Sequence, residues 1–180
     1  MLADYVTEGG KLLVAAGPVK DGSLENLYGL LSDYGVQAQE GIVVEADRMH
    51  YAFQRPYILL PDMSRHAITD SLIEENYYPI MPTSTGLVAD SSSGSGTVTE
   101  LLTTSYDSFS KTAGYDLSTY DWEEGDIEGP FAVAVSVENS QDRYDGNECL
   151  AVVDGEPVSF VQRSDVVDLI EAVHGIVLNE

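Results

Sequence analysis

The chain has 180 residues, 31 of them acidic and 8 basic, so its formal net charge is −23. So acidic a surface repels phosphates, which excludes nucleic-acid binding and docking on anionic lipid through a basic patch. Because 43% of the residues are hydrophobic, the chain can build a core and is not a disordered chain. The length fits one domain, or one and a half.

The first segments alternate between a helix and a strand. Residues 2–8 read as the last turns of a helix, which Gly9 and Gly10 end. Residues 11–16 form a continuous apolar run, which is typical of a parallel strand covered on both faces. Since a βαβ unit would place another strand before the helix, we expect an upstream element.

A second helix is expected after the loop at residues 17–23. Ser23 is a good N-cap residue, and Glu25 stands in the first turn, where the helix dipole favours an anion. Gly35 ends the helix. The apolar residues at helical spacing are Leu24, Leu27, Tyr28, Leu31 and Tyr34.

The rest of the chain is predicted to be richer in strands. Strands are expected at residues 41–46, 56–61, 97–105 and 130–137, with a short helix over residues 69–78 and a polar loop over residues 90–98. Two short strands flank the hairpin signal Asp154-Gly155. A last helix begins at Ser164 and ends at Gly175. This order predicts an α/β fold with a mixed sheet and no internal repeat.

The loop "GPVKDGS" at residues 17–23 resembles a phosphate-binding loop only loosely. Gly17 and Gly22 have the separation of the P-loop glycines, but Ser23 stands where the lysine is needed. No G-x-G-x-x-G is present either. We therefore do not predict nucleotide binding, although a helix beginning at Ser23 would favour a small anion.

Other catalytic patterns are also missing. The segment "SSSGSG" lacks the G-x-S-x-G elbow of serine hydrolases. The single cysteine, Cys149, begins a strand without an elbow and is interpreted as structural; it excludes an intramolecular disulfide. No run approaches the roughly 18–20 apolar residues of a membrane span, and no signal peptide is visible. We expect a cytosolic protein or a domain of something longer.

The histidines do not predict a metal centre or a cofactor. Asp47 with His50, and Asp62 with His66, have spacings that suit a metal only on a helix, and both pairs look like loops. His174, near the end of the last helix, is interpreted as a favourable charge there. The acidic segments "DWEEGDIEG" and "DRYDGNE" do not match the EF-hand pattern and are interpreted as solvated loops.

Several segments resemble a known family. They are "DYVTEGGKLLV", "LLSDYGV" followed by "GIVVE", "LLPDM" followed by "HAIT", and "LLTTS". In this order they are similar to the extracytoplasmic auxiliary domain of ABC-2 type transport systems, the GldG-like gliding-motility family, which is related to GIFT domains of intraflagellar transport proteins. The resemblance covers residues 1–138. Residues 139–180 would complete or extend the same domain.

The resemblance implies a fold and a cellular context. The fold would be flavodoxin-like, as in class I glutamine amidotransferases, with helices on both faces of a layered sheet and without their nucleophile. The domain would lie on the extracytoplasmic face of the membrane, anchored through segments outside this chain. Its partners would be an ABC permease and ATPase, and no cofactor is implied.

We therefore predict a non-catalytic accessory domain of an ABC-type export system that binds partner subunits or cargo. In an open parallel sheet the site lies beyond the carboxyl ends of the strands, here the loops after Ala16, Ala46 and Pro61. The candidate binding residues are Lys20, Asp47, His50, Tyr51, Asp62 and His66.

Two alternatives stay open. A carbohydrate-active or amidotransferase-like enzyme on the same fold would need an acid–base pair, for which Asp62 and His66 are the candidates. A surface glycan-binding module would place Tyr51, Tyr57 and Tyr78 on one exposed groove.

Overall fold

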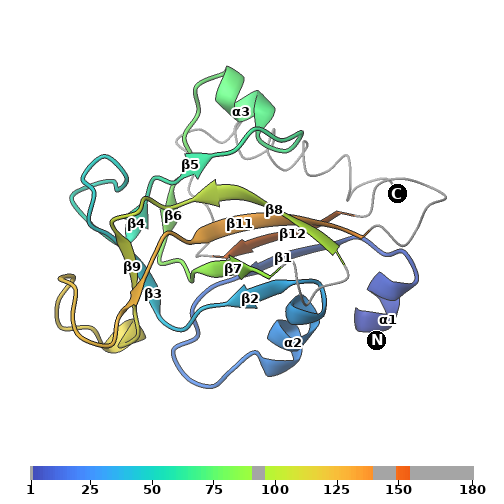
Figure 1. Cartoon of the computed structure of the whole chain (residues 1–180), viewed down its shortest axis with the longest axis horizontal. Helices are drawn as coiled ribbons and strands as arrows, with labels where there is room; N and C mark the ends of the chain where they lie inside the picture. Colours follow the sequence, from blue (N-terminus) through green and yellow to red (C-terminus); the bar gives the residue numbers. More distant parts are fainter. Residues whose placement is uncertain (1, 91–95, 140–148, 155–180) are drawn as a thin grey trace.

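A seven-stranded sheet forms the centre of the molecule (Figure 1). The computed structural model describes residues 2–90, 96–139 and 149–154. Along its main path the sheet has the order β1 (Leu12–Ala16), β12 (Cys149–Asp154), β11 (Ala132–Asn139), β7 (Leu87–Ala89) and β2 (Val36–Ala38). The strand β8 (Gly96–Thr103) also pairs with β11, and β5 (Asp62–Met63) pairs with β8.

Two small sheets and three short helices surround it. One small sheet has the order β10 (Ile127–Glu128), β9 (Ser108–Lys111) and β3 (Ile42–Glu45), and the other pairs β4 (Ile58–Leu59) with β6 (Met81–Pro82). The α-helices of the described residues are α1 (Leu2–Thr7), α2 (Glu25–Asp33) and α3 (Asp70–Glu74), and a 3-10 turn, η1, covers Gly114–Asp116.

The predicted flavodoxin-like fold, an amidotransferase-like layered sheet with helices on both faces, is wrong. Within the described residues β1 and β12 are the only parallel pair, and the other strand pairs are antiparallel. The physical reason lies in the connections. Consecutive parallel strands need crossover connections of a dozen residues or more, usually a helix, but after α2 the described residues contain only one α-helix, the five-residue α3.

The strand β1 also differs from its prediction. It is a strand and pairs in parallel with β12, as predicted. Of its five residues, however, only Val14 is buried, and Leu13 is exposed. The apolar run at residues 11–16 is therefore not a strand covered on both faces. An apolar composition alone does not distinguish a strand that is covered on both faces from a strand with one exposed face.

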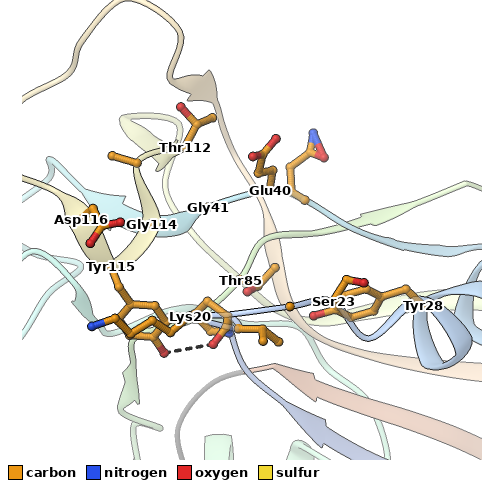
Figure 2. Close-up of a pocket in the computed structure, with 15 residues that line it drawn as sticks. Lys20, Ser23, Tyr28, Glu40, Gly41, Thr85, Thr112, Gly114, Tyr115 and Asp116 are labelled. Carbon is orange, nitrogen blue, oxygen red and sulfur yellow. Dashed lines mark hydrogen bonds between the residues drawn. The ribbon is translucent and has the colours of Figure 1, made fainter.

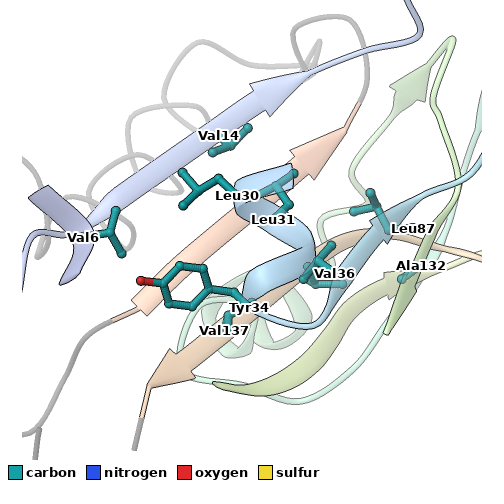
Figure 3. Packing of buried hydrophobic residues seen from close by; sticks show 10 residues of the cluster. Val6, Val14, Leu30, Leu31, Tyr34, Val36, Leu87, Ala132 and Val137 are labelled. Atoms are coloured by element: carbon teal, nitrogen blue, oxygen red, sulfur yellow. The ribbon is translucent and has the colours of Figure 1, made fainter. Parts of the chain in front are cut away.

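The core lies on both sides of β11, whose residues 132–137 are all buried. On one face, α1 and α2 pack against the sheet through a cluster that includes Val14, Leu31 and Val137 (Figure 3). On the other face, Val133 packs with Met81 and residues of β3, β4 and β8. A strand that is buried on both faces reads as the continuous apolar run "FAVAV".

Most predicted helices and strands exist, with corrected ends. The N-cap residue of α2 is Leu24 and no side chain caps it, so the predicted role of Ser23 is wrong. Thr69 is the N-cap residue of α3, but its hydroxyl donates to the carbonyl of Ser64 at 2.5 Å instead of capping the helix. The predicted helix at residues 164–175, the far side of the hairpin at Asp154-Gly155 and residues 91–95 lie outside the described residues.

A buried lysine fixes the acidic segment between β9 and β10. Lys111 is 0% exposed, and its Nζ donates to the carbonyl of Asp121 at 2.8 Å, to Glu123 Oε2 at 2.7 Å and to Asp126 Oδ2 at 2.8 Å. Burial lowers the pKa of Lys111, but these two carboxylates outweigh it and the pKa is raised. The pKa of Asp126 is lowered despite its burial, because Lys111 and backbone N–H groups stabilise its anion. The segment predicted to be a solvated loop is thus held by one cation.

We expect Lys111→Met to destabilise the fold by about 3 kcal/mol, because it leaves a buried carboxylate without its partner. Urea denaturation measures the change, and Lys11→Met, at an exposed lysine, should stay within about 0.5 kcal/mol. The stability that Asp126 contributes exists above its unfolded pKa and is lost as pH falls through the lowered pKa. The difference between wild type and Lys111→Met should therefore shrink in acid, and a constant difference would contradict this role.

Candidate functional site

The loop after β3 is held in place by a buried carboxylate. Glu45, the last residue of β3, is 1% exposed. Its Oε1 accepts the N–H of Asp47 at 3.1 Å and the hydroxyl of Ser105 at 2.7 Å, and its Oε2 accepts the N–H of Ser105 at 3.0 Å. One side chain therefore connects this loop to the turn between β8 and β9.

The next residues form a local turn. Asp47 Oδ1 accepts the N–H of Met49 at 2.9 Å, and the Asp47 carbonyl accepts the N–H of His50 at 3.0 Å. Aspartate commonly bonds the backbone two residues ahead in this way. The turn brings the imidazole of His50 back onto the carboxylate of Asp47.

His50 lies between two carboxylates. Its Nδ1 is 2.9 Å from Asp47 Oδ2, and its Nε2 is 3.4 Å from Asp62 Oδ2 at the start of β5. Burial lowers the pKa of His50, but the hydrogen bond to Asp47 and the charges of Asp62, Asp47 and Glu45 outweigh it, so the pKa is raised. The pKa of Asp47 is lowered, first by the N–H of Met49 and then by His50. The two carboxylates therefore stabilise the cationic form of His50 relative to a free imidazole.

The three side chains border a cleft of about 460 Å³, to which β8 and the turn after it contribute Glu100, Ser105, Tyr106 and Asp107. A neighbouring hollow of about 450 Å³ shares Tyr106 and Asp107 and adds Trp122. Tyr106 is 87% exposed and Trp122 is 53% exposed. We call these two hollows, which share Tyr106 and Asp107, the aromatic cleft.

A second pocket of about 420 Å³ lies elsewhere and contains another predicted residue, Lys20 (Figure 2). The loop after β1 forms one wall and the turn from Gln39 to Gly41 another. Residues 112–116, after β9, complete it, and the hydroxyl of Tyr115 donates to the carbonyl of Pro18 at 3.0 Å. We call it the Lys20 pocket.

The structure brings together Asp47, His50 and Asp62, but not the other predicted residues. Lys20 lies in the separate pocket. His66 Nδ1 accepts the N–H of Ile68 at 3.2 Å, and its Nε2 is 3.5 Å from Ser136 Oγ. Asp62 pairs with His50. Asp62 and His66 therefore do not form the acid–base pair that the enzyme alternative requires.

The three tyrosines of the predicted glycan groove lie outside the pockets described above. Tyr51 forms a β-bridge with Leu59, and the ring of Tyr57 packs on Tyr120 with centroids 5.3 Å apart. Tyr51, Tyr57 and Tyr78 line neither the aromatic cleft nor the Lys20 pocket. The exposed aromatic residues of the cleft come from other segments.

Sequence reasoning missed Glu45, Ser105, Tyr106 and Trp122. The segment "LLTTS", which contributes to the family resemblance, ends at Ser105, so it marked the right place without indicating a role. The described residues contain no group of three or more His, Cys, Asp or Glu side chains arranged to hold a metal. Nor do they include a helix with the length and apolarity to cross a membrane.

Comparison with known proteins identifies a fold and no family. No protein-family model matches the sequence, and neither does any curated protein. Among solved structures, the mmIFT52 N-terminal domain is similar, with a TM-score of 0.60 and 16% identity, over 96% of this chain and 67% of that one. The two share a fold. This agrees at the level of the fold with the predicted relation to intraflagellar transport domains, whereas the GldG-like assignment stays a prediction.

We expect the His50 imidazole to titrate above its ordinary value near 6.5 in an NMR titration. Asp47→Asn should lower the midpoint, because it removes the largest stabilising contact of the imidazolium. Asp107→Asn, in the same cleft but without a contact to His50, should change it less. A midpoint that does not change in Asp47→Asn would refute this arrangement.

The stabilisation of the fold by His50 is complete below the unfolded pKa of the imidazole and is lost as pH rises through the raised pKa. The variant His50→Gln should therefore lose more stability in acid than in base.

Proposed function

We propose that this chain is a non-catalytic binding domain and that the aromatic cleft is its principal contact surface. The observation that carries the proposal is the position of His50 between Asp47 and Asp62. Both ring nitrogens face carboxylates, so both are engaged within the cluster. The cluster is therefore suited to hold a loop in one conformation.

The surface around the cluster has the features of a protein-binding site. Exposed tyrosine and tryptophan are the residues that most often supply binding energy at interfaces, and Tyr106 and Trp122 flank the cleft. Met49 and Phe53, also exposed, belong to the same loop as His50. Asp47, Asp62, Glu100 and Asp107 give the cleft a negative rim. We expect a partner segment with an apolar side chain and flanking Lys or Arg, since complementary charge speeds and orients association.

The proposed partners are those that the sequence resemblance implies, an ABC permease and its ATPase, with this domain on the extracytoplasmic face of the membrane. The similarity of fold to the mmIFT52 N-terminal domain supports a domain of this general kind but names no partner for it. The net charge of −23 supports a protein partner over a nucleic acid.

The natural full-length protein, purified from mild detergent, should carry ABC permease and ATPase subunits that mass spectrometry detects. The double variant Tyr106→Ala/Trp122→Ala should recover them at least about tenfold less, because it removes the two aromatic anchors. Tyr78→Ala, at an exposed tyrosine outside the cleft, is the control and should recover them normally. Circular dichroism checks that the variants fold.

Recovery of no transporter subunit would overturn the assignment to an export system. Equal recovery by wild type and the double variant would overturn the aromatic cleft as the contact surface.

A further inference from the structure

The Lys20 pocket is formed by segments that are held together independently of the aromatic cleft. The N–H of Gln39 donates to the carbonyl of Gly86 at 2.7 Å, and the N–H of Val43 donates to the carbonyl of Ser84 at 2.8 Å. These bonds place Thr85 beside Gly41. On the other side, the hydrogen bond from Tyr115 to Pro18 ties residues 112–116 to the loop after β1. The pocket therefore has fixed walls on opposite sides.

Thr85 is the unusual member of this pocket. It is 3% exposed, and its hydroxyl has no hydrogen-bond partner among the described residues. A buried hydroxyl without a partner is unfavourable, and natural proteins have few of them. Figure 2 shows Thr85 between the Lys20 loop and the turn at Glu40 and Gly41. Rotation of its χ1 to another staggered position would present the hydroxyl to a molecule in the pocket.

We propose that the Lys20 pocket binds a small uncharged saccharide, with Thr85 as a hydrogen-bonding residue at its base. Ser23, Gln39 and Thr112 offer further hydroxyl and amide groups, which both donate and accept as sugar hydroxyls do. The carboxylates of Glu40 and Asp116 accept two more hydroxyl groups. The rings of Tyr28 and Tyr115 offer apolar surface to the C–H face of a sugar.

The charges in the pocket disfavour the other ligand classes. Lys20 is the single cation among its lining residues, against the two carboxylates of Glu40 and Asp116, so a phosphate or a nucleotide would meet net repulsion. The volume of about 420 Å³ falls in the range of small-molecule sites, which is typically about 300–1,000 Å³. A single sugar ring or a disaccharide fits that range.

Two buried hydroxyls allow a matched pair of variants. Thr85→Val removes the unpartnered hydroxyl and keeps the side-chain shape. Ser84→Ala removes the neighbouring hydroxyl, which is also buried and unpartnered but belongs to a residue that does not line the pocket. Both variants should raise the melting temperature, because each removes a polar group that has no partner. Only Thr85→Val should weaken saccharide binding.

The test is an NMR titration of the labelled protein with a panel of uncharged monosaccharides and disaccharides, and with inorganic phosphate. We expect at least one saccharide to shift the amide signals of Gly41 and Thr85 with a Kd of about 1 mM. Thr85→Val should weaken that binding about tenfold, whereas Ser84→Ala leaves it unchanged.

Three results would overturn the proposal: no saccharide shifts these signals, phosphate binds in place of the saccharides, or Thr85→Val binds as tightly as wild type. Because the aromatic cleft is a separate surface, Tyr106→Ala/Trp122→Ala should not change saccharide binding. The proposed partner role and the saccharide site therefore stand or fall separately.

Discussion

The hydrogen bonds to the Glu45 carboxylate are the interactions on which the candidate site depends. The carboxylate lies at the end of β3, almost completely buried, and accepts three hydrogen bonds from two segments far apart in the chain. A buried charge is unfavourable unless such donors compensate it. The donors come from Asp47 and Ser105. These hydrogen bonds fix the start of the loop that carries His50 and also the turn that carries Tyr106. The positions of these two segments in the aromatic cleft therefore depend on Glu45.

A second buried charge does the same for the opposite wall. Lys111 gathers Asp121, Glu123 and Asp126, and so orders the segment on which Trp122 stands. Figure 1 places this segment and the loop between β3 and β4 at the same end of the molecule. The hydrophobic core around β11 supports this end but does not reach the exposed side chains. Burial of apolar side chains therefore stabilises the sheet, and buried charged side chains fix the loops.

The sequence predicted the elements better than their arrangement. Apolar runs such as residues 41–46 and 130–137 indicate strands because a buried strand must be apolar, and Gly35 marks a helix end because it adopts a positive φ, here 85°. Pairing direction depends on which strands become neighbours, and strands such as β3 and β9 are far apart in the chain, so the order of segments wrongly favoured a parallel sheet. Asp47 and His50 were identified together because their partners are local. Glu45 and Lys111 look like ordinary surface charges in the sequence, and only contacts with residues 105 and 121–126 reveal their roles.

The most direct test of this account is amide hydrogen exchange of the wild type and Glu45→Gln. The glutamine keeps the shape of the side chain but presents an NH₂ group where the carboxylate meets only donors, so at least one of the three bonds is lost. The amide of Asp47, that of Ser105 or both should then exchange at least about tenfold faster, while that of Val43, which bonds the carbonyl of Ser84, keeps its protection. Unchanged protection at Asp47 and Ser105 would show that the cleft does not depend on Glu45 and would contradict the account.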